Sequence, residues 1–297
     1  MRKKIILDTD LGDDIDDAFA LLLTCASEEL ELLGITTVYR CPEERARMTA
    51  KLLADAQMNA EIYCGEKYPL KQDCMYGRKI DFEKLPWSYS KEYDNVSFNK
   101  KTAFDFMCET LKNESGVTLI AVGPLTNVAK LIKERPDLAS KLEKIVIMGG
   151  AYEINKAEYN IACDPEAAEI VFDSGLNIDL VGLDVTLKCV IPDEKLKGLW
   201  EKSPAFKTLY SMRSKWAYRV CLHDPLTVMS LIEKDVVSFN QAVVKVETEG
   251  KYTRGMTVVL SSPEWLVSAE QSKTRIATDV NVDLFVEELF RRLDKIN

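Results

Sequence analysis

The sequence predicts an α/β protein: an open, mostly parallel sheet flanked by helices, with a small antiparallel appendage near the C-terminus. Short apolar runs alternate along the chain with helix-like stretches, which is the pattern of βαβ units. The runs are apolar at successive positions, as expected of parallel strands covered on both faces. The 13 Gly and 10 Pro are scattered, and no linker separates two parts. We therefore expect a single domain over residues 1–297.

The predicted elements follow in chain order. Residues 4–7 form a short apolar run typical of a buried strand, Gly12 breaks it, and residues 18–23 predict a core helix. The alternation continues with strands at 35–38, 117–122, 144–148 and 178–181 and helices at 45–54, 125–134, 165–173 and 283–293. Residues 242–246 and 256–260 lie on either side of a polar turn region and predict the antiparallel appendage.

Charge and composition exclude several classes of partner. The net charge of −9 argues against binding to a nucleic acid polymer or an anionic membrane. No stretch approaches the ~20 apolar residues of a membrane span, and the apolar run before Asp8 is too short for a signal peptide. The 8 cysteines include no Cys-x-x-Cys pair, which favours reduced thiols. These features predict a cytoplasmic protein.

A cluster of acids follows the first predicted strand. No Lys or Arg lies between residues 5 and 39 to neutralise them, so their mutual repulsion would oppose folding. Helix capping explains one or two of these acids but not all of them. An EF-hand is excluded because Phe19 stands where its bidentate Glu would be. The cluster predicts an oxygen-ligated site for Ca²⁺ or Mg²⁺; its members are Asp8, Asp10, Asp13, Asp14, Asp16 and Asp17.

Other polar motifs also follow predicted strands. Residues 123–127 come after the strand at 117–122, residues 149–151 after that at 144–148, and residues 183–186 after that at 178–181. Ligands of open α/β sheets collect outside the carboxyl ends of the strands, so these motifs and the acids are expected to share one rim.

In their order, six motifs resemble the inosine-uridine preferring nucleoside hydrolase family over nearly the whole chain. They are Asp-Thr-Asp at 8–10 with Asp-Asp-Ala at 16–18, Gly-Pro-Leu-Thr-Asn at 123–127, Met-Gly-Gly-Ala at 148–151, Glu-Tyr-Asn at 158–160, Asp-Pro-Glu-Ala-Ala at 164–168 and His-Asp-Pro-Leu at 223–226. The resemblance implies a Ca²⁺-dependent enzyme that hydrolyses the N-glycosidic bond of a ribonucleoside to ribose and free base. It also implies a homodimer or homotetramer.

The resemblance assigns roles to individual residues. It implies that Ca²⁺ is held by Asp10, Asp17, Asp224 and the Thr126 carbonyl, that Asp10 takes a proton from a metal-bound water, and that His223 protonates the leaving base. It gives Asp16, Met148, Glu158 and Asn160 as substrate contacts. Trp216 and Tyr218 are either walls for the base or ordinary core or lid aromatics.

Several of these assignments have alternatives. Asp16 could be a helix-capping acid, and Glu158 and Asn160 could make ordinary loop hydrogen bonds. The acidic segment is two residues longer than the commonest family form, so Asp13 or Asp14 could take the place given to Asp16 or Asp17. Asp224 could instead cap a helix that begins at Pro225, and one carboxylate could do both.

The chain departs from the family pattern on the side of the base. Residues 38–41 read Val-Tyr-Arg-Cys where relatives carry an Asn, and residues 75–78 replace a family His, which leaves Cys41 and Tyr76 as candidate contacts. A short loop at 151–158 leaves Asn155 as the substitute for another family Asn. These changes predict a base other than that of plain inosine or uridine. The alternatives are a catalytically silent Ca²⁺-binding nucleoside sensor and a haloacid dehalogenase-type phosphatase, which also carries Asp-x-Asp after its first strand.

Overall fold

The computed structural model describes residues 2–71, 73–215, 218–260 and 272–296. Within these ranges one central sheet contains nine strands. They are β1 (Lys3–Thr9), β2 (Leu30–Thr37), β3 (Ile62–Cys64), β6 (Asn99–Thr102), β7 (Val117–Ala121), β8 (Leu142–Met148), β9 (Ile178–Val181), β12 (Val237–Gln241) and β15 (Thr274–Val280). Their order is β12-β15-β9-β8-β7-β1-β2-β3-β6, and only the edge strand β12 runs antiparallel to its neighbour in that described sheet.

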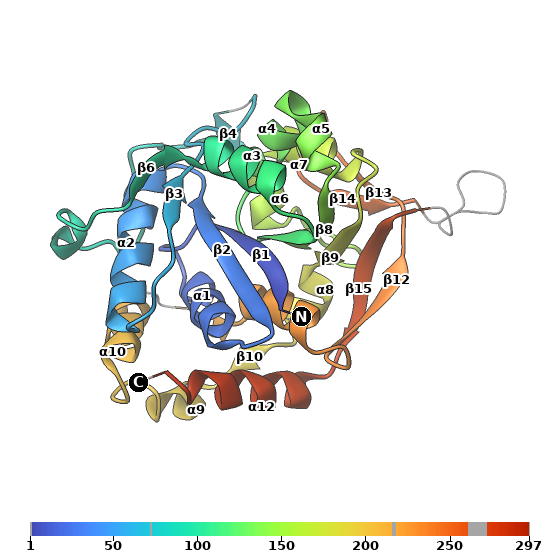
Figure 1. Cartoon of the computed structure of the whole chain (residues 1–297). Helices are drawn as coiled ribbons and strands as arrows, with labels where there is room; N and C mark the ends of the chain where they lie inside the picture. Colours follow the sequence, from blue (N-terminus) through green and yellow to red (C-terminus); the bar gives the residue numbers. More distant parts are fainter. Residues whose placement is uncertain (1, 72, 216–217, 261–271, 297) are drawn as a thin grey trace.

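Helices cover both faces of the sheet (Figure 1). One face is covered by α1 (Asp16–Ala26), α2 (Pro42–Asp55), α8 (Leu183–Thr186), α9 (Asp193–Lys197), α10 (Pro204–Ser214), α11 (His223–Ile232) and α12 (Val282–Leu293). The other face is covered by α3 (Ala103–Asn113), α4 (Thr126–Glu134), α5 (Pro136–Ala139), α6 (Tyr159–Cys163) and α7 (Pro165–Phe172).

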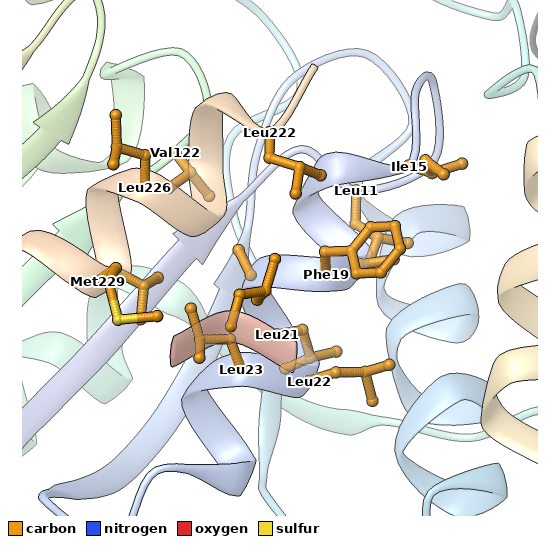
Figure 2. Close-up of a cluster of buried hydrophobic side chains, with 14 of the residues drawn as sticks. Leu11, Ile15, Phe19, Leu21, Leu22, Leu23, Val122, Leu222, Leu226 and Met229 are labelled. Atoms are coloured by element: carbon orange, nitrogen blue, oxygen red, sulfur yellow. The ribbon is translucent and has the colours of Figure 1, made fainter. Parts of the chain in front are cut away.

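Alternation along β1 explains why both faces are apolar. Ile5 and Leu7 belong to the core under α1, whereas Ile6 points into the core on the opposite face. Each of the three side chains is fully buried. On the first face, Phe19 of α1 lies in the same apolar cluster as Leu226 of α11 (Figure 2). This packing fixes the start of α1 beside the start of α11, so the acids of one helix meet those of the other.

The predicted fold class is confirmed. The antiparallel appendage is β13 (Val244–Val246) paired with β14 (Thr257–Val259), and two further small pairs are β4 (Cys74–Met75) with β5 (Arg78–Lys79) and β10 (Val190–Ile191) with β11 (Val220–Cys221). The chain also forms a short 3₁₀ helix at Lys91–Tyr93. Among the described residues, no helix is both long and apolar enough to cross a bilayer.

Candidate active site

A cavity of about 430 Å³ opens at the carboxyl ends of the central strands. Asp10 follows β1 in its wall, Val122 follows β7, Met148 ends β8, and Leu183 follows β9. The acids after β1 and Leu183 after β9 thus share this rim as expected, whereas the motifs at 123–127 and 149–151 contribute only the residues directly before them, Val122 and Met148. The cavity also contains the starts of α1 and α11, because these two helices pack against each other.

Four carboxylates lie nearly buried in this cavity. Asp10, Asp16, Asp17 and Asp224 are each at most 6 % exposed. Burial raises the pKa of Asp10 to about 7 and that of Asp16 to about 6, and burial together with neighbouring acids raises the pKa of Asp17 and Asp224 well above the usual range. Buried carboxylates crowded in this way are costly without a compensating cation.

The arrangement fits a divalent cation. One carboxylate oxygen from each of Asp14, Asp16 and Asp17 can lie within 4.8 Å of the other two. Asp17 is held in place by the hydroxyl of Thr9, which donates to its Oδ1. Oxygen ligands at this spacing are the set that Ca²⁺ and Mg²⁺ prefer.

Asp16 links the two helices. Its Oδ2 accepts the main-chain N–H groups of His223 at 3.1 Å and Asp224 at 3.2 Å, so this carboxylate of α1 satisfies the free N–H groups at the start of α11. The expected capping role of Asp224 is wrong: α11 begins at His223, its N-cap is Leu222, and the Leu222 side chain makes no capping bond. Asp224 lies inside the first turn, where its carboxylate faces the cavity.

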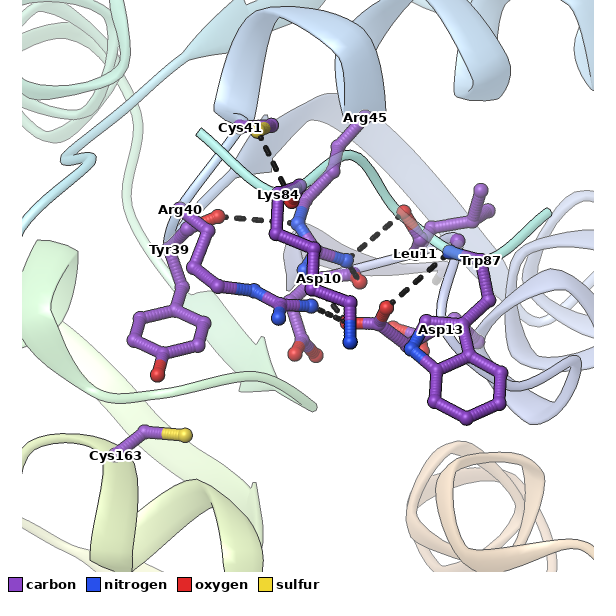
Figure 3. A network of polar contacts seen from close by, with 12 residues as sticks. Asp10, Leu11, Asp13, Tyr39, Arg40, Cys41, Arg45, Lys84, Trp87 and Cys163 are labelled. Carbon is purple, nitrogen blue, oxygen red and sulfur yellow. Dashed lines mark hydrogen bonds and ion pairs between the residues drawn. The ribbon is translucent and has the colours of Figure 1, made fainter. Parts of the chain in front are cut away.

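Asp13 is neutralised by arginine (Figure 3). Its Oδ2 pairs with Arg40 and with Arg45, the latter at 2.9 Å. Although burial alone would raise the pKa of Asp13, the charges of Arg45 and Arg40 hold it below its usual range. Of the two extra acids in the long segment, Asp13 thus belongs to an ion-pair network, whereas Asp14 stays with Asp16 and Asp17.

Arg45 is the largest fully buried side chain among the described residues. Its guanidinium donates to the main-chain carbonyls of Asp10, Leu11 and Tyr39 as well as to Asp13. The guanidinium of Arg45 on α2 therefore holds the main chain around Asp10 in place.

The opposite wall carries Met148, Glu158 and Asn160. Glu158 caps α6, and its carboxylate accepts N–H groups from Asn160 at 2.8 Å, from residue 161 at 3.1 Å and from Gly150 at 3.2 Å. Burial nevertheless raises its pKa to about 7. The Asn160 amide donates to the Val122 carbonyl at 2.9 Å. Both side chains line the cavity and are suited to hydrogen bonds with hydroxyl groups.

His223 lies at the same cavity, at the start of α11. Its Nδ1 contacts the hydroxyl of Thr186 at 2.7 Å, and its Nε2 has no hydrogen-bond partner in the described part of the chain. Burial lowers the pKa of His223 below the usual value, against an opposing effect of Asp14. The imidazole is thus fixed by one nitrogen while the other stays available.

Thr126, expected as a carbonyl ligand, does not line the cavity. It is the first residue of α4, so its carbonyl points along that helix, and its hydroxyl donates to Asp164 at 2.7 Å. The main-chain segment that does reach the cavity is at Val122, four residues earlier.

Four other expected substrate contacts also lie away from the cavity wall. Cys41 is buried with its Sγ 3.4 Å from the carbonyl of Lys84, and Tyr76 donates to the carbonyl of Ala157 while lining a different cavity. Asn155 is exposed, and Tyr218 lines a neighbouring hollow of about 340 Å³ that also includes His223. Trp216 lies outside the described residues.

Among the charged and aromatic residues that line the cavity, the sequence did not identify Arg40, Lys84, Trp87, Lys156 and Tyr159. Arg40 stands in the segment that replaces the family Asn, so that departure was the available signal. Lys84 and Trp87 come from the long connection between β3 and β6, and no local pattern predicts where such a connection folds.

The sheet and the cavity together define an α/β enzyme with an acidic site suited to a divalent cation and a hydroxylated ligand. The chain belongs to the inosine-uridine preferring nucleoside hydrolase family, whose model matches residues 5–287. It is therefore an enzyme of the nucleoside hydrolase class. A curated relative, the pyrimidine-specific ribonucleoside hydrolase RihA of Salmonella paratyphi B, is 33 % identical over 312 residues and covers 99 % of both chains.

Solved structures agree with this membership. A purine-preferring ribonucleoside hydrolase from Gardnerella vaginalis superposes with a TM-score of 0.83 at 27 % identity and covers 99 % of each chain. The plant nucleoside hydrolase PpNRh1 superposes with a TM-score of 0.85 at 25 % identity, over 99 % of this chain and 100 % of the other. The names of these relatives span pyrimidine and purine preferences.

Proposed function

We propose that this protein hydrolyses the N-glycosidic bond of a ribonucleoside to ribose and free base in a Ca²⁺-dependent reaction. One observation carries the proposal: the buried acids, the side chains of Glu158 and Asn160, and the imidazole of His223 all line one cavity of about 430 Å³. Family membership supports the same reaction. It also argues against the phosphatase alternative.

Asp10, Asp17 and Asp224 are the side chains that would hold the cation. The main-chain oxygen at Val122 is proposed in place of that of Thr126, because Val122 lines the cavity and Thr126 does not. A bound Ca²⁺ would lower the pKa of a coordinated water and so supply the nucleophile. Asp14 is a further candidate ligand, since its carboxylate lies near that of Asp17.

The protein's own groups have separate tasks. Asp10 accepts the proton of the attacking water, Glu158, Asn160 and Asp16 bind ribose hydroxyls, and Met148 packs against the sugar. His223, held by Thr186 through Nδ1, gives a proton to the departing base through Nε2. Binding the ribose between the acids and Glu158 keeps its anomeric carbon beside Asp10.

Ribose release from a panel of nucleosides tests the proposal. The wild type with Ca²⁺ should release ribose, and Asp10→Asn should lose at least ~10³-fold in kcat, because it removes both a ligand and the base. Binding without turnover would favour the nucleoside sensor, and phosphate release from phosphoesters would favour the phosphatase. Asp173→Asn, a surface acid paired with Lys245, is the matched control and should keep full activity.

The proposal extends to the domain organisation, the oligomeric state, the location and the base. The expected single domain agrees with a family match from residue 5 to residue 287. A homodimer or homotetramer, and a cytoplasmic location, remain predictions. Sedimentation of the purified protein would give the oligomeric state. The base also stays open, because the relatives differ in the preferences that their names state.

A further inference from the structure

Arg40 reaches the cavity from an unusual backbone conformation. Tyr39 and Arg40 have φ angles of 69° and 53°, which are rare for residues with a side chain. Their N–H groups donate to the carbonyls of Glu66 and Lys67, at 2.7 Å and 2.9 Å, which holds this strained turn in place. Strained turns of this kind cost free energy and cluster at functional sites, so this turn points to a functional role for the Arg40 side chain.

The guanidinium of Arg40 is only partly used by the protein. Asp13 takes Nη2, whereas Nε is sealed from solvent with no hydrogen-bond partner and Nη1 has no partner among the described residues. Nη1, unlike Nε, is not sealed from solvent, so it is the donor in this cavity wall that is suited to an acceptor oxygen supplied by a ligand.

The same wall has an excess of positive charge. Arg40 and Arg45 share the one carboxylate of Asp13. Lys84, beside them in Figure 3, has its Nζ 5.1 Å from the ring centre of Trp87 and no carboxylate within ion-pair distance in the described ranges. Lys156, on the loop before Glu158 and so on the opposite wall, also lines the cavity without an ion pair in those ranges. The acids are proposed to bind the metal, so they leave these cations free for another anion.

We propose that the physiological substrate carries an oxyanion, either a 5′-phosphate on the ribose or a carboxylate on the base, and that Arg40 and Lys84 bind it. The inference rests on the proposed hydrolysis. In the reaction the oxygen of one water bonds to C1′ as the C1′–N bond breaks. One proton of the water stays on the new C1′ hydroxyl and the other goes to Asp10, while His223 gives a proton to the departing base; exchange with solvent then returns Asp10 and His223 to their starting states. The oxyanion is unchanged and serves only for binding.

Matched substrates test the inference. Uridine is compared with uridine 5′-monophosphate and with orotidine, and inosine with inosine 5′-monophosphate, by kcat/KM in Ca²⁺. We expect kcat/KM for either the 5′-monophosphates or orotidine to exceed that for the neutral nucleoside by about tenfold or more. This preference for the anionic substrate should fall by a similar factor in Lys84→Ala and in Arg40→Lys. Lys84 is exposed, so its variant tests the idea without endangering the fold.

Lys251→Ala is the control, because Lys251 also lies over an aromatic ring, that of Tyr252, but is outside the cavity. It should keep the wild-type preference. The phosphate and the carboxylate arms identify which oxyanion is bound. Equal kcat/KM for neutral and anionic substrates, or a preference that survives both variants, would overturn the inference and leave the hydrolase proposal standing. No cleavage of any substrate would instead contradict the hydrolase itself.

Discussion

At the scale of single residues, the site depends on the guanidinium of Arg45, which takes no part in the proposed reaction. Arg45 is fully buried and binds three main-chain carbonyls around Asp10 as well as the carboxylate of Asp13. The acids of the N-terminal segment can therefore face the cavity while the backbone behind them is neutralised. Such a buried charge is costly to introduce and costly to remove.

We predict that Arg45→Ala lowers the free energy of unfolding by about 3–5 kcal/mol, because it leaves buried carbonyls without a donor. Denaturant unfolding measures the loss. Arg47→Ala, two residues later on α2, is the comparison: Arg47 donates to the carbonyls of Asp94 and Val96 at the surface, and its loss should cost about 1 kcal/mol. Equal losses in the two variants would show that Arg45 does not support the site in the proposed way.

The role of His223 can be separated from positioning by changing the leaving group. If Nε2 protonates the base, His223→Ala should reduce kcat on nucleosides by about 10²–10⁴-fold but leave the hydrolysis of a p-nitrophenyl riboside nearly unchanged, because that leaving group needs no proton. Steady-state kinetics on both substrates measure this. Parallel losses would assign His223 to positioning. Thr186→Val, which removes the Nδ1 contact, should give a smaller loss of the same kind.

Much of the site could be predicted at this scale, because charge leaves a local signal. Six acids without a nearby cation already indicated a metal site, and Asp10, Asp16, Asp17 and Asp224 all line the cavity. Arg40 and Lys84 could not be predicted as wall residues, since their positions depend on a strained turn and on a long connection. For Thr126 the sequence motif was recognised, but the direction of the Thr126 carbonyl could not be predicted, because it depends on where α4 begins.

At the scale of elements, the C-terminal helix α12 offers a pH-dependent stability test. Glu288 accepts from Arg291 at 2.7 Å and from Arg292, and these hydrogen bonds lower its pKa to about 2. Arg292 continues the network to Glu29, which precedes β2, at 2.8 Å. The helix is thus tied to the first βα unit by charge as well as by apolar packing.

Because the folded pKa of Glu288 lies below its unfolded value, the ion pairs stabilise the protein fully above about pH 5, and this contribution is lost as the pH falls through about 2. We predict that Glu288→Gln costs about 1 kcal/mol at pH 7 and progressively less between pH 4.5 and 2.5. Urea unfolding at each pH measures the difference. Glu287→Gln, an exposed neighbour, should have little effect at any pH; a pH-independent cost at Glu288 would contradict the ion-pair account.

The predicted elements were most accurate where an apolar run or a helical period was long. The strand at 144–148 became β8 and the helix at 165–173 became α7 with shifts of a residue or two. The strand β6 was not predicted because its sequence, Asn-Lys-Lys-Thr, is polar, as edge strands often are. Its pairing with β3 is a tertiary contact that no local pattern contains.

At the scale of the whole molecule, the fold concentrates acidic groups whose charge a bound cation would balance. The starts of α1 and α11 are brought together by the core beneath them, so Asp16, Asp17 and Asp224 are buried beside Asp10. Folding energy from the apolar core therefore holds the acids in a costly arrangement. A cation that binds this arrangement, and not the unfolded chain, must stabilise the native state.

We therefore predict that Ca²⁺ raises the Tm of the protein and that a chelator lowers it. At a free Ca²⁺ concentration of about 100 Kd the linkage is worth about 2.7 kcal/mol, which for a chain of this size corresponds to a Tm shift of roughly 5 °C. Asp17→Asn should abolish most of the shift, and its Tm in chelator should equal or exceed that of the wild type because one repulsive charge is gone. Asp173→Asn should keep the full shift. If neither Ca²⁺ nor chelator changes the wild-type Tm, the acids are neutralised by bound protons and not by a cation, which is the state that their raised pKa values favour.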